Sequence, residues 1–267
     1  MPRKIIYRNS GQNHGLITRV IHPRVQGKLT KPFVFLDYIN GDPPKGTGFG
    51  WHPHSGIATF TYYVEGSTDI QESTGNRVSL GVRDIEYLEA GNGVWHKGQI
   101  RDDSYARGFQ LWIALPPEMQ LQEPKSVFLK EQDITKGRDF HLLLGKYNGL
   151  ESKITPPYNL NYLEVNLGKG QGWTYHTPSE HDILFIFLYE GDLTGDYHVR
   201  QPELIVFENG NLPVDFHTLN GAKFLLGSAQ IFDYELLVKG SSIHTSQELL
   251  MKSIQRIQEI RPEILVA

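Results

Sequence analysis

Short β-rich runs alternate with turn signals along almost the whole chain, and this pattern limits the fold more than any other feature. The 27 glycines and 15 prolines among the 267 residues are spread along the sequence and do not gather in one linker. Residues 57–64, for example, end at Glu65-Gly66, and residues 108–115 end at Pro116-Pro117. Regularly spaced short strands are typical of β-sandwiches and barrels. We therefore expect an all-β fold.

A polar segment divides the chain. Residues 118–138 lack strong periodicity and look like a connection from one half of the chain to the other. The β pattern resumes at residue 140. The Glu-Gly pair at 190–191 closes one strand much as the pair at 65–66 closes an earlier one, a weak internal echo that favours two related barrels. The expected domains are residues 1–135 and residues 136–267.

The end of the chain changes character. Thr245-Ser246-Gln247-Glu248 is a capping-box pattern, with Thr245 as the N-cap. Apolar residues then recur at helical spacing, and Pro262 is expected to stop the helix. We expect an amphipathic helix over residues 246–260 that packs on the sheet surface; a helix that binds a partner protein is the alternative.

Composition excludes several classes of function. The formal net charge of −4 gives no support for direct binding to nucleic acid or to a membrane surface. The absence of cysteine excludes disulfides, thiolate metal sites and cysteine nucleophiles. No segment approaches the ~18 apolar residues of a membrane span, and the first residues carry no signal-peptide pattern. We expect a cytoplasmic protein.

Three histidines form the strongest candidate site. His52 and His54 are separated by one residue, so in a β-strand their side chains leave the same face. His96 follows the turn Gly91-Asn92-Gly93 and could close a three-nitrogen site of the kind that suits Fe, Cu, Ni or Zn. The neighbouring Trp51 and Trp95 would then face away from the site and pack against the barrel or its rim.

The other histidines are expected to be loop, surface or hydrogen-bonded residues, and a second metal site is not expected. His176 and His181 flank Pro178, and their spacing of five would place them on opposite faces of a strand. The charged turn Arg101-Asp102-Asp103 is either solvated surface or a lid over a pocket mouth. The remaining histidines of this group are His14, His22, His141, His198 and His217.

Several ordered motifs resemble the pirin family of the cupin superfamily. They are residues 32–37, His52-Pro53-His54-Ser55-Gly56 through Gly66, Gly91-Asn92-Gly93-Val94-Trp95-His96, residues 108–116 and, more faintly, residues 240–246 with the helix after them. This resemblance implies two tandem cupin domains, each a jelly-roll β-barrel, with a C-terminal helix. It also implies one metal in the N-terminal barrel.

The resemblance further implies the ligands, and here the chain departs from the family. The family's three histidines fall on His52, His54 and His96, but its glutamate ligand falls on Gly98, which has no side chain. Gln99 lies one position out of phase and would turn inward only through a bulge. The family metal is usually iron, so Fe(II) is expected, with Cu, Ni, Mn, Co or Zn as alternatives. A weakly bound metal or a metal-free pocket also stays open.

Two functions follow from the resemblance. The first is a quercetin 2,3-dioxygenase-like oxidoreductase that uses the three-histidine metal centre on a flavonol-like small molecule. The alternative is a non-catalytic regulatory or protein-binding pirin with a weakened or empty metal site. The resemblance assigns no separate catalytic residue, and whether the protein is an enzyme stays open at this point. A monomer is expected, because two barrels in one chain already pair with each other.

Overall fold

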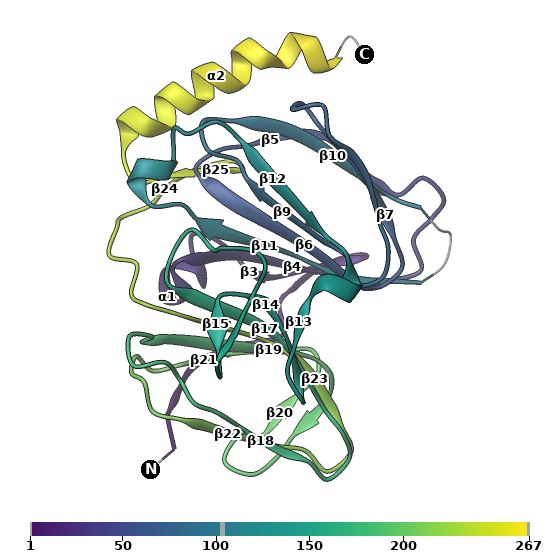
Figure 1. Ribbon diagram of the computed structural model, residues 1–267, viewed down its shortest axis with the longest axis vertical. Helices are drawn as coiled ribbons and strands as arrows, with labels where there is room; N and C mark the ends of the chain where they lie inside the picture. The colour runs from purple at the N-terminus through teal and green to yellow at the C-terminus, as the bar shows by residue number, and fades with distance from the viewer. Residues whose placement is uncertain (1, 102–104, 266–267) are drawn as a thin grey trace. The chain divides into compact units, whose positions relative to one another are not determined.

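The structure, a computed structural model, describes residues 2–101 and 105–265, which form two compact units. Asp102 and Asp103 of the charged turn lie outside the described residues. One unit contains His52, His54 and His96 and is called the histidine unit. It comprises Asn13–Arg24, Phe33–Gln132 and the residues from Asp233 onward. The second unit comprises the residues up to Gln12, Val25–Pro32 and Asp133–Phe232. Both are built almost entirely from strands, as the sequence predicts (Figure 1).

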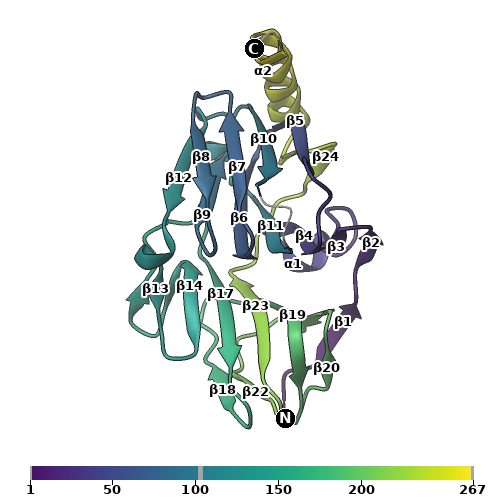
Figure 2. The same ribbon diagram turned by 90° about the vertical axis from the view of Figure 1, so that its right-hand side faces the viewer.

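The ends of the chain do not follow the expected division at residue 135. Strand β1 (Ile5–Asn9) pairs antiparallel with β21 (Glu203–Phe207) and therefore belongs to the second unit. It lies in purple at the edge of that unit's sheet in Figure 2. The final residues belong to the histidine unit, where Ser55 forms a bridge with Ser242. Both assignments depend on pairing between strands that are far apart in the sequence. Local composition does not predict such pairing.

Two main sheets form the histidine unit. The seven-stranded sheet has the order β12-β9-β6-β11-β4-β3-β2, and the four-stranded sheet has the order β5-β10-β7-β8. In sequence order the strands are β2 (Gln12–His14), β3 (Ile17–Ile21), β4 (Phe33–Gly41), β5 (Gly48–His54), β6 (Ile57–Glu65), β7 (Thr68–Glu72), β8 (Arg77–Leu80), β9 (Ile85–Glu89), β10 (Val94–Ile100), β11 (Ala106–Ala114), β12 (Lys125–Leu129), β24 (Leu237–Lys239) and β25 (Ser242–His244). The last two form a hairpin.

An eight-stranded sheet forms the second unit. Its main order is β1-β21-β19-β23-β17-β14-β13, with β20 paired to β19, and two short hairpins, β15-β16 and β18-β22, accompany it. The bounds are β13 (Thr135–Lys136), β14 (Phe140–Leu144), β15 (Lys146–Tyr147), β16 (Leu150–Glu151), β17 (Leu160–Leu167), β18 (Gly172–Tyr175), β19 (Ile183–Leu193), β20 (Val199–Arg200), β21 (Glu203–Phe207), β22 (Val214–His217) and β23 (Ala222–Ala229). A short helix, α1 (Gly27–Thr30), belongs to this unit.

The central strands of the histidine unit are buried on both faces. In β6 every residue from Ile57 to Val64 is buried, and β11 and β4 are nearly as well covered. Leu111 on β11 lies opposite Phe60 on one side and Leu36 on the other. Aromatic and branched side chains suit such pleated, two-sided packing. These strands form the core of the histidine unit, and the neighbouring four-stranded sheet carries His52, His54 and His96.

The polar crossing contains more structure than the sequence predicts. Strand β12 pairs with β9 from Lys125↔Glu89 to Leu129↔Ile85, and two 3₁₀ turns, Pro117–Met119 and Glu131–Asp133, flank it. The connection expected over residues 118–138 therefore contains a strand of its own. As an edge strand β12 is only half buried, so its residues do not show the apolar alternation of a core strand.

Helix α2 (Gln247–Leu265) confirms the expected C-terminal helix but differs at both ends. Ser246, not Thr245, is the N-cap, because its Oγ accepts the backbone N–H of Leu249 at 3.2 Å. The helix also continues past Pro262, since a proline removes one backbone hydrogen bond and does not always end a helix. Among the described residues, no helix is both long and apolar enough to cross a membrane.

The helix packs on its own unit, as the amphipathic pattern predicts. Ile257 and Trp95 are both 8% exposed and lie in contact, with Trp51 and Ile260 against them. The indole Nε1 of Trp95 donates to the backbone oxygen of Ile257 at 3.1 Å. In Figure 1 the yellow helix lies beside β5 and β10. Both tryptophans therefore pack at the rim, as the sequence predicts.

We predict that Ile257→Ala lowers the free energy of unfolding of the histidine unit by about 2 kcal/mol. The reason is the loss of a buried aliphatic side chain and the cavity left against Trp95. Urea unfolding followed by tryptophan fluorescence measures the change. Met251→Ala on the same helix is the matched control, because Met251 is 49% exposed; a change below about 0.5 kcal/mol is expected there. Equal effects of the two substitutions would contradict this packing.

Candidate metal centre

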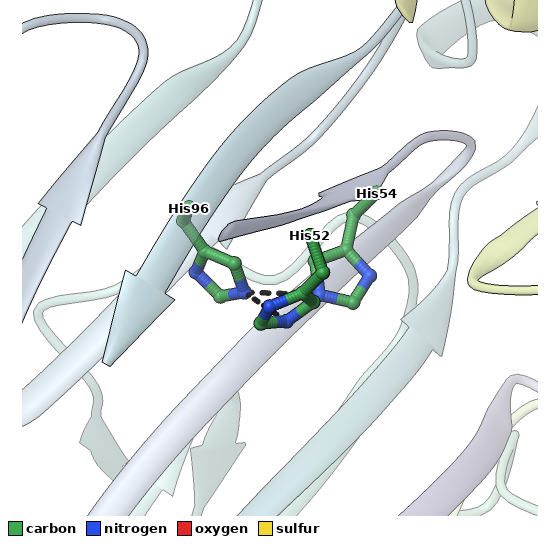
Figure 3. A group of neighbouring side chains, drawn as sticks. All are labelled: His52, His54 and His96. Carbon is green, nitrogen blue, oxygen red and sulfur yellow. Dashed lines mark hydrogen bonds between the residues drawn. The ribbon is translucent and has the colours of Figure 1, made fainter. Parts of the chain in front are cut away.

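Two adjacent strands bring the three histidines together. His52 and His54 lie on β5, and His96 lies on β10, which pairs antiparallel with β5 so that His96 is opposite His52 and Val94 is opposite His54. Residues opposite each other, or two apart on one strand, share a face of the sheet. The i,i+2 spacing and the register therefore place all three rings on one face, where they point toward one another (Figure 3).

The Nε2 atoms converge. The Nε2 of His96 lies 3.0 Å from the Nε2 of His54 and 2.9 Å from the Nε2 of His52. One ligand atom of each ring lies within 4.8 Å of those of the other two. His54 and His96 are buried, whereas His52 is partly exposed and marks the side from which the cluster is reached.

Backbone oxygens fix the orientation of two rings. The Nδ1 of His52 donates to the oxygen of Gly50 at 2.8 Å, and the Nδ1 of His54 donates to the oxygen of Ser241 at 3.3 Å. With the proton on Nδ1, the Nε2 of each ring carries a lone pair toward the centre. Both lone pairs face the Nε2 of His96, and that nitrogen has at most one proton to offer. Hydrogen bonding alone therefore leaves the cluster incompletely satisfied.

Burial keeps these rings neutral. It lowers the pKa of His52 to about 4, with a further contribution from the nearby His96. Burial also lowers the pKa of His54 well below its ordinary value, helped by the charges of His96 and His52. Neutral imidazole is the form that binds metals. His52 and His54 can therefore bind a metal at neutral pH without first losing a proton.

The donor set fits a transition metal. Nitrogen ligands lie about 2.1 Å from such ions, so two of them at a right angle around one ion lie about 3.0 Å apart. The Nε2 separations of 3.0 and 2.9 Å in the cluster agree with this spacing. A cation also resolves the repulsion between the converging lone pairs. The residues therefore suit an ion that takes imidazole ligands and has positions left for other molecules.

Gly98 lies beside the cluster and contributes no ligand. The register of β10 against β5 shifts between His96 and Gly98, which is the bulge considered from the sequence. Gln99 is nevertheless exposed, so the bulge does not turn its amide inward. Gly98 itself lines a cavity of about 30 Å³ with His52 and His96. A Cβ at this position would contact only the Oγ1 of Thr68, at 3.7 Å, so space does not explain the glycine.

Glu86 on β9 is a residue of the site that the sequence did not reveal. It is fully buried, it lines the same cavity, and its Oε1 lies 3.6 Å from the Nδ1 of His96. The Oγ1 of Thr61 donates to its Oε2 at 2.7 Å. In β9 all residues from Ile85 to Leu88 are buried, so strand alternation alone could not show which face carries chemistry. The available signal was a carboxylate inside an apolar strand.

A larger cleft of about 500 Å³ reaches the cluster at His52. Phe35 and Trp112 stack in it with ring centroids 3.8 Å apart, and Trp112 also meets the ring of His54 edge-on. Arg19 lies over Phe35 at 4.4 Å. The cleft therefore offers flat aromatic surface and a cationic group beside the histidines.

The same cleft holds an ion pair. The guanidinium of Arg19 donates two hydrogen bonds, both of 2.9 Å, to the carboxylate oxygens of Asp37. Burial raises the pKa of Asp37, and these hydrogen bonds from Arg19 oppose that effect. The pair fixes the position of the guanidinium at the wall of the cleft.

The other histidines are not brought to the cluster. His181 is buried in the second unit, where Nδ1 contacts Ser228 Oγ at 2.8 Å and Nε2 contacts Asn159 Oδ1 at 3.0 Å. It thus lies in the loop before β19, as the sequence predicts, and is a buried, hydrogen-bonded residue. His141 pairs with Glu164 at 3.0 Å. Among the described residues, His52, His54 and His96 are the one cluster with metal-ligand spacing.

The fold and site define a class of protein. Two tandem, strand-built units and a three-histidine cluster in one of them are the architecture of a two-domain cupin. The quercetin 2,3-dioxygenase of Acinetobacter baumannii has a similar structure, with a TM-score of 0.88 over 97% of this chain and 98% of that one, at 20% identity. The bacterial pirin YhhW of Escherichia coli, solved in complex with nickel(II), gives a TM-score of 0.67 over 84% and 98%, at 18% identity.

Sequence comparison gives the family. The pirin family profile matches residues 16–113, which include the three histidines. Pirin-like protein 2 of Arabidopsis thaliana is 26% identical over 233 residues, covering 84% of this chain and 72% of the relative. Residues 16–113 therefore contain a pirin domain, and the chain resembles pirin-like proteins over most of its length. The resemblance and the cupin fold predicted from the sequence are confirmed.

We predict that His181 makes the second unit sensitive to acid. Burial lowers the pKa of His181 from 6.5 to about 4, so the unfolded chain binds a proton that the folded chain does not between these values. Stability is full above about pH 6.5 and falls as the pH approaches 4, by up to about 3 kcal/mol for this residue. In urea unfolding at pH 7, 5.5 and 4, His181→Gln should show a smaller loss.

The exposed His198 of the same unit provides the control. His198→Gln should leave the pH dependence of unfolding unchanged, because its ring stays in water in both states. A loss between pH 7 and pH 4 that is the same in His181→Gln and in the wild type would contradict the assignment.

Proposed function

We propose that this pirin is a metal-dependent oxidoreductase of the quercetin 2,3-dioxygenase type, with its metal held by His52, His54 and His96. The convergence of three imidazole nitrogens at separations of 2.9 and 3.0 Å carries the proposal. Fe(II) is the proposed ion, and Ni, Cu, Mn, Co and Zn are alternatives that also accept imidazole ligands. The structural similarity to the quercetin 2,3-dioxygenase of Acinetobacter baumannii and to the nickel-bound pirin of Escherichia coli supports this proposal.

The bound metal would supply a Lewis acid and a redox centre for the reaction of a flavonol with dioxygen. The residues of the chain supply binding and orientation. Phe35 and Trp112, a stacked and largely buried pair, form the aromatic wall of the cleft and give a planar ring system apolar neighbours. The Arg19–Asp37 ion pair adds polar groups in the same cleft that can orient the hydroxyl groups of a flavonol.

The volumes of the cleft and of the small cavity agree with a site for a small-molecule substrate beside the three histidines. The cleft of about 500 Å³ lies within the range of small-molecule sites. The cavity of about 30 Å³ on the Glu86 side has room for about a water molecule and no substrate. A substrate therefore approaches the cluster from the side of His52, where the cleft reaches it.

We predict one tightly bound transition metal per chain, lost in His54→Ala and in His96→Ala. Each substitution removes one of three ligands from a buried site, so affinity should fall at least about 100-fold. Metal analysis by mass spectrometry after reconstitution, together with Ni(II) titration by calorimetry, measures both. His141→Ala in the second unit is the control and should bind as the wild type does. Metal retained by both site variants would contradict the ligand assignment.

We predict that the reconstituted protein consumes quercetin and dioxygen together, and that His96→Ala does not. The absorbance of quercetin and an oxygen electrode follow the reaction with Fe(II), Ni(II), Cu(II), Co(II) and Mn(II) in turn. Trp112→Ala should raise KM more than it lowers kcat, because it removes part of the aromatic wall but none of the ligands. Absence of turnover with all five metals would remove the flavonol dioxygenase proposal.

Gly98 favours a second candidate function. The position at which the resemblance implies a glutamate ligand carries no side chain, and a weakened centre suits a regulatory or protein-binding pirin. Full metal occupancy without turnover, combined with recovery of one partner protein at fixed stoichiometry, would support it. Monomeric state and cytoplasmic location stay predictions from the sequence.

A further inference from the structure

We propose that Glu86 is the positioning residue of the metal centre, acting through His96. This inference rests on the proposed function, because it assumes that His96 is a metal ligand. In this role the carboxylate accepts the Nδ1–H of His96, holds the ring in one orientation and directs the Nε2 lone pair at the ion. Glu86 would also place a negative charge beside a centre whose protein ligands are all neutral.

Two unpartnered groups face each other at this point. Glu86 is fully buried and its Oε1 has no hydrogen-bond partner. The Nδ1 of His96 is also buried and without a partner. The two atoms lie 3.6 Å apart, slightly beyond hydrogen-bond length. A small rotation of either side chain closes this gap and satisfies both groups at once.

The other two ligands show what His96 lacks. The Nδ1 of His52 donates to a backbone oxygen of Gly50, and the Nδ1 of His54 donates to that of Ser241. Each of these rings is thereby held with its Nε2 lone pair inward. Metal-binding histidines generally make this kind of outer contact. Glu86 is the group in the corresponding position behind His96, and it differs from the two backbone oxygens in carrying a full charge.

Thr61 holds the carboxylate in place. Its Oγ1 donates to Oε2 at 2.7 Å, and Thr61 lies directly opposite Glu86 in the pairing of β6 with β9. One oxygen is therefore fixed by the sheet and the other is left for His96. No lysine or arginine pairs with Glu86 in the described part of the chain. A buried charge without a cation is unfavourable, and a dication bound through His96 supplies the missing partner.

The chain also carries a matched pair away from the centre. In the second unit the Oε2 of Glu164 lies 3.0 Å from the Nδ1 of His141, and its Oε1 accepts the hydroxyl of Tyr189 at 2.6 Å. Glu164 is 2% exposed. This pair has the chemistry of Glu86 and His96 without a cluster of further histidines, so it separates the effect of burying a carboxylate from an effect on metal.

The test compares Glu86→Gln with Glu164→Gln in the full chain. Glu86→Gln keeps the shape and the contact with Thr61 but removes the charge. It should weaken Co(II) and Ni(II) binding about 10- to 100-fold and change the visible absorption spectrum of bound Co(II). Glu164→Gln should leave affinity and spectrum within about twofold of the wild type. Thermal unfolding of the metal-free proteins reports any loss of fold separately.

Glu86→Asp provides a second variant if the glutamine variant does not fold. It keeps the charge but shortens the side chain, and it should bind Co(II) with an affinity between those of the wild type and His96→Ala. Wild-type affinity and an unchanged Co(II) spectrum in a folded Glu86 variant would overturn the positioning role, while loss of binding in His96→Ala would leave the proposed metal centre standing. A wild-type protein that binds neither Co(II) nor Ni(II) would overturn both.

Discussion

The site depends on the pairing of β5 with β10. His52 and His54 share a face because they alternate on one strand, and His96 joins them because its register places it directly opposite His52. A shift of one residue in this pairing would turn His96 to the other face and disperse the donors. Three imidazoles held this close are poorly satisfied by one another. The pairing of β5 with β10 therefore holds the three rings in an arrangement that favours binding of a cation.

A row of polar side chains crosses the seven-stranded sheet beside these histidines. Glu86 pairs with Thr61, Thr61 with Gln110, Gln110 with Asp37, and Asp37 with Arg19, so the row crosses five neighbouring strands. Directly opposite residues in an antiparallel sheet share a face. The row therefore runs from the buried side of His96 to the wall of the open cleft. Its two ends are Glu86, behind His96, and Arg19, in the cleft.

Local sequence was sufficient for much of this structure. The i,i+2 spacing of His52 and His54 and the turn before His96 predicted the cluster, and ordered motifs predicted the family and the cupin fold. The helix was visible from its period, although Ser246 rather than Thr245 caps it. These features depend on neighbours within a few residues, and a single sequence records such neighbours directly.

Other features depend on partners far away in the sequence. The role of Glu86 depends on Thr61 and His96, which lie on other strands, and its place in an apolar strand does not show which of them it contacts. Likewise, β12 becomes a strand because β9 offers it an edge, although it lies in a largely polar segment. The division into units followed the same rule at β1. The role of Glu86, the strand β12 and the assignment of β1 all depend on strand pairing and register. Neither can be predicted from residue spacing and composition.

The assignment of the chain ends to the two units has a consequence for how the protein is made. The oxygen that orients His54 belongs to Ser241, and α2, which covers Trp95, follows it. A ribosome synthesises these residues well after the three histidines. A nascent chain can therefore contain the whole cluster and still lack the group that fixes one of its tautomers. The orientation of the His54 ring is in this way tied to a segment made nearly 150 residues after His96.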